Sequence, residues 1–462
     1  MVLKFINREN ELKALEERYR SEKPEFFIIY GRRRVGKTEL IKRFASGKSH
    51  FYFLAKEQPI VLEIERFREK FAEKFDMHIE RTEELEKIFA QILNKIDHDK
   101  KFVFIIDEFP YWVSKHHPIL SEFQYLWDEL LSKKNVFLIL AGSSVSMMEQ
   151  EVLAYKSPLY GRRTGQLKIE PLKLVCLKDF LPRYSAEDLF MVYGAVGGVP
   201  FYLKEFDDAL TIRENVKNTF FNKSSLLYEE AEILLREELR EVTTYFNIMK
   251  AIIDGATKLA EISSKARVDI TNINKYLTTL MNLGLVRKEH PVTQPPKLKN
   301  FLYVLNDNYF RFWLQYVYPY GEEIEEDVNT ALKIFENDYP RYMGGIFEDI
   351  CKKILRDLNM PVFKFPGTKI GRWWHKDKEI DIVALNDDTK EILFCECKWQ
   401  DKVNAKKVVA ELKEKAKFVL WNNDKRKEYY AVFAKSFKDK RKELDSMLFD
   451  LNDLKKSIKQ QP

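Results

Sequence analysis

The stretch IIYGRRRVGKTEL, residues 28–40, constrains the fold more than any other part of the chain. An apolar run ends at Gly31, and Gly36, Lys37 and Thr38 complete the spacing G-x-x-x-x-G-K-T before the helical pattern ELIKRFA. In a strand–loop–helix of this kind, the loop amides and the helix N-terminus face phosphates, the lysine reaches the β and γ oxygens, and the threonine ligates Mg²⁺. The pattern therefore predicts a nucleoside triphosphate site on a parallel α/β sheet.

The loop as a whole is expected to contact the nucleotide. Its predicted binding residues are Gly31, Arg32, Arg33, Arg34, Val35, Gly36, Lys37, Thr38 and Glu39. The three arginines could instead contact nucleic acid, but they occupy the variable positions of the loop. We therefore look for polyanion binding further along the chain.

An acidic pair follows the next strongly apolar run, FVFIIDEF at residues 102–109. Asp107 would hold Mg²⁺, directly or through water, and Glu108 would polarise the attacking water. Such a pair after a phosphate loop is typical of NTP hydrolysis, with Lys37 and Glu108 as catalytic residues.

Two further features could complete this site. The strand-like run LILAGSS ends with Ser143 and Ser144, whose hydroxyls could sense the γ-phosphate or orient water. The alternative is a plain turn at the end of a strand. The motif YGRRTG offers Arg162 and Arg163 as arginine fingers, in cis or across the interface of a homo-oligomer, or as an ordinary surface pair.

Apolar runs at residues 25–31, 50–56, 101–108, 136–144 and 165–172 predict strands, and nearly continuous apolar strands are typical of a parallel sheet covered on both faces. The length of 462 residues exceeds one hydrophobic core. The expected segments are a P-loop core at 1–175, a helical lid at 176–240, a winged helix at 241–307, linker helices at 308–338 and a nuclease-like α/β domain at 339–462.

The winged-helix prediction includes a candidate recognition helix in VDITNINKYLTTLMNLGLV. Ile270, Ile273, Leu277, Leu280 and Met281 would share one face. Short polar and basic residues would face outward near the helix start, as in helices that enter a DNA groove: Thr271, Asn272, Asn274 and Lys275. Packing or regulation is the alternative role.

The C-terminal segment carries a second set of acidic residues. In DKEIDIVALN and EILFCECKW, strand alternation places Glu396 and Lys398 on one face and the two cysteines of the second run in the core. Asp381, Glu396 and Lys398, with Glu348 on a preceding helix, resemble the PD-(D/E)-x-K nuclease core, although Ile380 replaces the name-giving proline. The resemblance implies that the carboxylates hold Mg²⁺ and that Lys398 positions the nucleophile. A solvated strand edge is the alternative.

A second resemblance covers residues 1 to about 300. FINRENEL, GRRRVGKTEL, FIIDEFP, SPLYGRRTGQLKIEPL and GGVP resemble the archaeal ATPase family, near the AAA+ and signal-transduction ATPases. It implies ATP as the nucleotide, Arg8 and the turn ending at Pro200 beside the adenine, and a C-terminal domain related to nucleases.

Composition narrows the remaining choices. A net charge of +6 excludes a general polyanion binder, although Lys and Arg exceed Asp and Glu from Lys398 onward, which would suit a DNA or RNA backbone. Four cysteines without a C-x-x-C pair favour a reducing compartment. With neither a signal-peptide core nor a run of about 18 apolar residues, we expect a cytoplasmic protein without a membrane span.

Two functions are consistent with these features. One is a nucleic-acid-associated ATPase whose Mg²⁺-dependent nuclease domain is gated by ATP. The other is a regulatory or signalling ATPase switch whose winged helix and C-terminal domain bind protein partners without cleavage.

Overall fold

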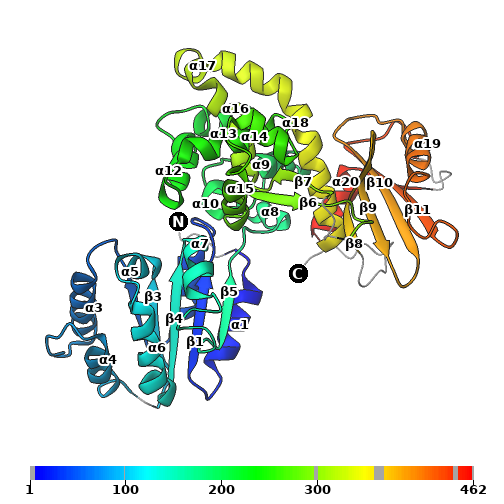
Figure 1. The fold of residues 1–462 in the computed structure, drawn as a ribbon. Coiled ribbons are helices and arrows are strands. Elements are labelled where there is room, and N and C mark those ends of the chain that lie inside the picture. Colours follow the sequence, from blue (N-terminus) through cyan, green and yellow to red (C-terminus); the bar gives the residue numbers. More distant parts are fainter. Residues whose placement is uncertain (1–5, 98, 296–299, 358–368, 441–445, 460–462) are drawn as a thin grey trace. The chain divides into compact units, whose positions relative to one another are not determined.

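The computed structural model describes residues 6–97, 99–295, 300–357, 369–440 and 446–459. It divides the chain into two compact units, Met1–Pro171 and Leu172–Pro462 (Figure 1). No helix of the described residues is both long enough and apolar enough to span a bilayer.

The first unit is built on a five-stranded parallel sheet with the strand order β2-β3-β4-β1-β5. The strands are β1 (Glu25–Tyr30), β2 (His50–Leu54), β3 (Phe102–Asp107), β4 (Val136–Gly142) and β5 (Gly165–Lys168). All five strands expected from the sequence are confirmed. Three of them, β1, β3 and β4, are buried at every position, as expected for parallel strands covered on both faces. The edge strand β5 instead alternates between half-buried and exposed residues.

Helices cover both faces of this sheet. They are α1 (Glu9–Tyr19), α2 (Lys37–Ala45), α3 (Ile60–Phe75), α4 (Leu85–Leu93), α5 (Pro110–Lys115), α6 (Ile119–Glu129), η1 (Leu131–Lys133), α7 (Val145–Met147) and η2 (Met148–Val152). Phe26 and Ile28 of β1 pack in the core under α3 to α6, whereas Phe27 and Ile29 pack on the opposite face with α1 and α2. The alternation of strand side chains thus supplies two cores.

The second unit begins with helices. They are η3 (Leu174–Cys176), α8 (Leu177–Phe180), α9 (Ala186–Val196), α10 (Pro200–Leu203), α11 (Ile212–Thr219) and α12 (Leu226–Glu238). Ser185 and Thr211 start α9 and α11 with capping boxes, which explains why these helices begin where they do.

Three helices and a hairpin follow: α13 (Val242–Ile253), α14 (Leu259–Ala266), α15 (Ile273–Asn282), β6 (Val286–Glu289) and β7 (Leu302–Leu305). The two strands pair antiparallel. Leu277 and Leu280 are fully buried as expected, but Ile270 is 47% exposed because α15 begins only at Ile273.

The chain then passes through α16 (Asn308–Tyr316), η4 (Tyr318–Tyr320) and α17 (Gly321–Glu326) into the long helix α18 (Val328–Asp357). A second five-stranded sheet has the order β12-β11-β10-β9-β8. Its elements are β8 (Lys369–His375), β9 (Lys378–Asn386), β10 (Glu391–Lys398), α19 (Ala405–Ala416), β11 (Lys427–Ala434), β12 (Met447–Phe449) and α20 (Leu451–Lys459). The first three strands are antiparallel neighbours, and β10, β11 and β12 run parallel.

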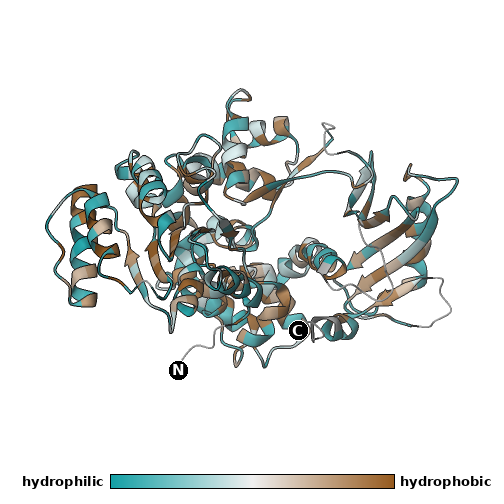
Figure 2. Cartoon of the chain, turned by 90° about the horizontal axis from the view of Figure 1, so that it is seen from below, coloured by the Kyte–Doolittle hydropathy of each residue, from teal (hydrophilic) through white to brown (hydrophobic). Residues whose placement is uncertain are grey.

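One hydrophobic cluster runs through the second unit from Leu174 to Leu454. Trp399, just after β10, packs on Phe190 of α9 and Phe347 of α18. The helical, three-helix, linker and C-terminal segments therefore share a core, and the boundaries proposed between them remain predictions. Figure 2 shows hydrophobic stretches in the strands, while the helices carry hydrophilic faces.

Candidate functional site

The loop between β1 and α2 has a backbone that requires its two glycines. Gly36, at the N-terminus of α2, has φ 95°, and Gly31 has φ 153°. A Cβ atom at Gly31 would lie 2.4 Å from the carbonyl oxygen of Ile169. Only glycine combines such a conformation with so close an approach, so the spacing in the sequence corresponds to a real geometric constraint.

Lys37 is buried inside this loop, with 5% of its surface exposed. Its Nζ donates to the carbonyl oxygens of Gly31 at 2.8 Å and Arg32 at 2.9 Å. The ammonium is thus held close to the backbone of the loop, which fits the binding of phosphate oxygens.

Asp107, at the end of β3, is almost fully buried and lies next to α2. Its Oδ2 accepts from Thr38 Oγ1 and from the Tyr52 hydroxyl, each at 2.8 Å, and its Oδ1 accepts from the amide of Glu108 at 3.0 Å. Carboxylate and hydroxyl oxygens are the ligands that Mg²⁺ prefers. Asp107 and Thr38 would hold the ion, which would supply positive charge beside the phosphates.

Glu108 adopts a left-handed backbone conformation with φ 56°, uncommon for a residue other than glycine. Its Oε2 accepts from the Ser143 amide at 3.1 Å and from the Ser143 Oγ at 2.7 Å. The predicted catalytic carboxylate is therefore oriented by the residue that follows β4. Ser144 instead caps α7.

Arg8 lies beneath the loop and is 6% exposed. Its guanidinium donates to the carbonyl oxygens of Val35 at 3.0 Å and Glu170 at 2.5 Å, and to Glu11 at 2.9 Å. Arg8 therefore ties the loop to the segment after β5. Contact with the adenine remains a prediction for it.

The other predicted residues of the nucleotide site have varied surroundings. Arg33 donates to the Tyr111 hydroxyl at 2.8 Å, Arg34 has a left-handed backbone with φ 67°, and Glu39 is exposed in the first turn of α2. Pro200 begins α10 in the second unit. Its place beside the adenine remains a prediction.

The two candidate arginine fingers have intramolecular partners. Arg162 forms an ion pair with Asp128 at 3.0 Å, and Arg163 lies over the ring of Tyr160 and donates to the Leu153 carbonyl at 3.4 Å. A role as a finger remains a prediction, and for Arg162 it would require release from Asp128.

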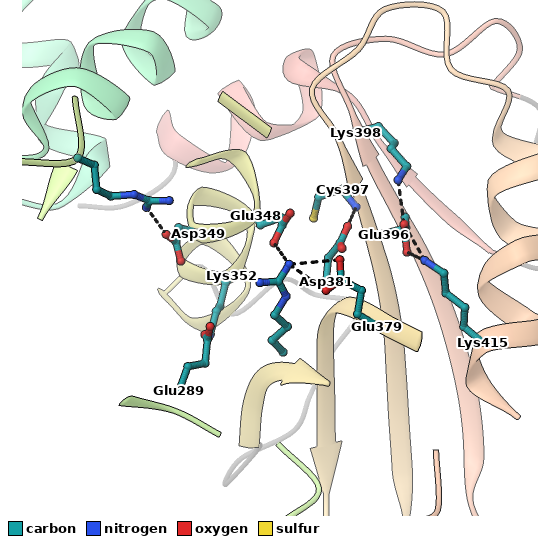
Figure 3. A network of polar contacts seen from close by, with 12 residues as sticks. Glu289, Glu348, Asp349, Lys352, Glu379, Asp381, Glu396, Cys397, Lys398 and Lys415 are labelled. Carbon is teal, nitrogen blue, oxygen red and sulfur yellow. Dashed lines mark hydrogen bonds and ion pairs between the residues drawn. The ribbon is translucent and has the colours of Figure 1, made fainter. Parts of the chain in front are cut away.

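The acidic residues of the C-terminal segment come from three elements (Figure 3). Asp381 on β9 is 9% exposed, and its Oδ2 accepts from the Cys397 amide at 2.7 Å. Glu396 on β10 is 6% exposed and accepts from Lys398 at 2.8 Å and from Lys415 of α19 at 3.1 Å. The structure thus surrounds Glu396 with two ammonium groups.

Glu348 of α18 lies beside this pair. Burial and the nearby charge of Asp381 raise the pKa of Glu348, and burial and the charge of Glu396 raise the pKa of Asp381. Arg372 of β8 forms ion pairs with Glu348 at 3.5 Å and Glu379 at 3.4 Å. A cation placed between the carboxylates would reduce their mutual repulsion. The negative charge of these side chains is therefore compatible with a metal ion.

The carboxylates of the C-terminal sheet could supply only part of the ligands of a metal ion. Nowhere in the described parts of the chain do three His, Cys, Asp or Glu side chains converge as a metal-ligand group. Mg²⁺ is commonly held by one or two carboxylates together with substrate phosphates. A site on Asp381 and Glu396 would be of that kind.

An ionic network connects α18 to the hairpin. Arg287 of β6 and Arg311 of α16 donate to Asp349 at 3.1 and 2.8 Å, and Lys352 donates to Glu289 at 2.9 Å. Although burial opposes it, the two guanidinium groups lower the pKa of Asp349 to about 2. A cavity of about 210 Å³ lies among these groups and also reaches Glu348, Arg372 and Asp381.

Two of the contacting residues, Tyr52 and Lys415, had not been identified from the sequence. Tyr52 is the polar-tipped residue between two phenylalanines of β2, so strand alternation could have separated it from the core. Lys415 is one of several lysines on α19. Nothing in the sequence distinguishes it from the others.

Comparison with known proteins shows similarity along nearly the whole chain. The uncharacterized protein MJECL04 of Methanocaldococcus jannaschii is 38% identical over 452 residues, which are 97% of this chain and 99% of that protein. The uncharacterized ATP-binding protein MJ0423 of the same organism is 49% identical over 47 residues, 10% of this chain and 80% of that protein.

Two family descriptions and one solved structure complete the comparison. Residues 5–206 match an ATPase domain found predominantly in Archaea, and residues 313–409 match archaeal and bacterial proteins of unknown function. The Walker-type ATPase PABY2304 of Pyrococcus abyssi has a TM-score of 0.51 at 20% identity, over 67% of this chain and 96% of that one, which shows a shared fold. The protein is an ATPase, and the chain belongs to the archaeal family of P-loop ATPases.

Proposed function

We propose that this ATPase acts on nucleic acid through its C-terminal sheet. The observation that carries the proposal is that Asp381, Glu396 and Lys398 lie together on β9 and β10, with Glu348 of α18 beside them (Figure 3). The order helix, three antiparallel strands, helix and parallel strand from α18 to β11 also matches the resemblance to nucleases in the sequence.

These residue types suit phosphodiester hydrolysis. Asp381 and Glu396 would hold Mg²⁺, which supplies an activated water and charge stabilisation when bound. Lys398 keeps its proton, because the carboxylate of Glu396 outweighs the effect of burial and raises the lysine pKa. Its ammonium could therefore orient the nucleophile or offset the charge on the phosphate.

The three-helix segment α13 to α15 with its hairpin supports a role in nucleic-acid binding. Thr271, Asn272, Asn274 and Lys275 are exposed at the start of α15, while Leu277 and Leu280 anchor the opposite face. A winged helix presents this kind of surface to a DNA groove. We assign the segment that role as part of the proposal.

The same segment could control the C-terminal site. Its hairpin joins α18 through Arg287 and Glu289, and the amide of Val292, beyond β6, donates to the Arg372 carbonyl of β8 at 3.0 Å. A movement of the hairpin would therefore shift both the helix that bears Glu348 and the strand that bears Arg372. Control by ATP is a hypothesis motivated by the order of the segments.

Cleavage of single-stranded and plasmid DNA with Mg²⁺, with and without ATP, tests the proposal. Asp381→Asn keeps the size of the side chain and removes the charge, so it should abolish cleavage and leave ATP hydrolysis unchanged. Asp387→Asn, an exposed residue just after β9, serves as the matched control. Equal cleavage by the wild type and Asp381→Asn would remove the nuclease assignment.

The second candidate is a regulatory switch that binds protein partners without cleavage. It is favoured by the two lysines that already neutralise Glu396, because a metal ion would have to compete with them. Binding of a DNA duplex at increasing salt separates the two functions. Affinity that falls steeply with salt supports nucleic-acid action, whereas no measurable binding at low salt supports the switch.

A further inference from the structure

Tyr52 is in contact with the predicted Mg²⁺ ligands but belongs to neither of the motifs that predicted them. It lies on β2, which pairs with β3 so that Tyr52 stands opposite Ile105 and Leu54 opposite Asp107. Phe51 and Phe53 point into the core under α3, whereas the ring of Tyr52 lies with the core of the opposite face, beside α2. Strand alternation therefore directs a phenol towards the nucleotide site.

The phenol and a hydroxyl share one carboxylate oxygen. Tyr52 and Thr38 both donate to Oδ2 of Asp107 at 2.8 Å. The other oxygen accepts from the backbone of Glu108. The Asp107 carboxylate is thus held at three points, one on each of β2, α2 and its own turn, which leaves it little freedom to rotate.

The direction of these hydrogen bonds matters for a metal ion. A hydroxyl has one proton and two lone pairs, so donation by Thr38 to Asp107 keeps its lone pairs available to a cation. If the carboxylate rotated away, Thr38 would lose the acceptor that fixes its proton. A residue that holds Asp107 in place therefore also orients Thr38.

Tyr52 is suited to this role because its hydroxyl has one proton, which it donates to Oδ2 of Asp107 at 2.8 Å. Its ring packs with the core on the face of α2, and its backbone is paired with β3. The place of the phenol oxygen is therefore set by the fold.

We propose that Tyr52 is a positioning residue that orients Asp107 and Thr38 for Mg²⁺ in the nucleotide complex. Groups that orient metal ligands typically change metal affinity about 10- to 100-fold when they are removed. Tyr52→Phe removes one hydroxyl and keeps the ring. We therefore expect its main effect on Mg²⁺ affinity, with a smaller effect on the binding of nucleotide alone.

Metal binding and activity provide separate measurements. Binding of Mn²⁺ to the ADP complex, followed by electron paramagnetic resonance, should weaken about 10-fold or more in Tyr52→Phe. In ATP hydrolysis, the Mg²⁺ concentration at half-maximal rate should rise, and saturating Mg²⁺ should restore most of kcat. Fluorescent ADP in the presence of a chelator should bind to the variant and the wild type equally well.

Tyr19→Phe is the control, because the Tyr19 hydroxyl also makes one hydrogen bond in the same unit, to the Lys101 carbonyl at 3.3 Å. Its metal dependence should equal that of the wild type. The proposal is overturned if Tyr52→Phe binds Mn²⁺ as tightly as the wild type. It is equally overturned if nucleotide binding without metal weakens as much as metal binding does, since that would indicate a general disturbance of the site.

Discussion

The nucleotide site and the acidic site of the C-terminal sheet differ in the charge of the groups that donate hydrogen bonds to their carboxylates. Asp107 accepts from two neutral hydroxyls and a backbone amide, whereas Glu396 accepts from two lysine ammonium groups. Glu348, beside the second pair, faces the guanidinium of Arg372. Both sites have buried carboxylates, and in the second the ammonium groups of Lys398 and Lys415 contact one of them directly.

This difference has a physical consequence for metal binding. Hydroxyl donors orient a carboxylate and leave its negative charge for a cation. Ammonium donors neutralise that charge, so a cation must displace them or be stabilised by an added phosphate. Asp107 would therefore offer its full charge to Mg²⁺, whereas Glu396 would need a substrate phosphate to complete its site.

The largest expected effect is a loss of ATP hydrolysis at the nucleotide site. Lys37→Ala removes the ammonium bonded to the loop carbonyls and should lower ATP hydrolysis at least about 10³-fold, because a fixed charge on the transferring phosphoryl group is lost. Phosphate release measures this. Arg43→Ala, at an exposed position of the same helix, should keep the wild-type rate. Retained turnover by Lys37→Ala would contradict the assignment of the site.

Glu108→Gln tests the catalytic role within the first site. The amide keeps the size of the side chain but cannot polarise water as a carboxylate does, so hydrolysis should fall about 10²-fold or more while ATP still binds. Equilibrium binding of a fluorescent ATP analogue and phosphate release should be measured together. If binding fell in parallel with the rate, Glu108 would be holding the loop rather than acting on water.

Replacement of both lysines tests the contrast in the second site. Lys398→Gln with Lys415→Gln removes the ammonium groups that compete for Glu396, so Mn²⁺ alone should bind more tightly, on the order of several-fold. Mn²⁺ affinity is measured by isothermal titration calorimetry. A parallel titration of Asp381→Asn shows which part of the Mn²⁺ binding belongs to this site. Unchanged Mn²⁺ affinity after the double replacement would mean that the lysines do not control access of a cation.

The last prediction concerns the stability of the first unit and a carboxylate that is structural. Glu63 of α3 is fully buried and accepts from Trp112 at 2.9 Å, Arg66 at 2.8 Å and the Lys56 amide at 2.9 Å. Glu63→Gln should cost about 1–3 kcal/mol in the free energy of unfolding, because these donors lose a charged acceptor. Thermal or urea unfolding measures the change.

The pH dependence of that loss follows from the pKa of Glu63. Burial raises it, but Arg66, Trp112 and the Lys56 amide outweigh burial, so the pKa in the folded protein is below the ordinary value of 4.5. The stabilisation is present above that value and is lost as the pH falls through the lowered pKa. The difference in stability between the wild type and Glu63→Gln should therefore shrink below about pH 4.5. A constant difference would show that the charge plays no part.

The sequence predicted correctly those features that are encoded by residues close together in the chain. The strands of the first sheet and the loop from Gly31 to Thr38 are encoded by contiguous residues, and the structure has these strands where the apolar runs predicted them. In the C-terminal sheet only two strands had been identified. β8 and β11 combine apolar with charged and aromatic residues, and β12 has only three residues, so all three have weaker patterns.

Contacts between distant residues could not be predicted in the same way. The bond from Ser143 to Glu108, the contact of Tyr52 with Asp107 and the pairing of Lys415 with Glu396 each join separate elements. Such contacts depend on strand order and helix placement, which periodicity does not specify. The burial of the strand cysteines, in contrast, was correctly predicted by alternation alone.

The continuous core of the second unit also restricts how this chain can evolve by recombination. Trp399 of the C-terminal sheet fills space between α9 and α18. Transfer of the sheet to another protein by recombination would expose that aromatic surface to water and leave a gap behind. We therefore expect the helical part and the sheet to be inherited as one block, with insertions confined to surface loops.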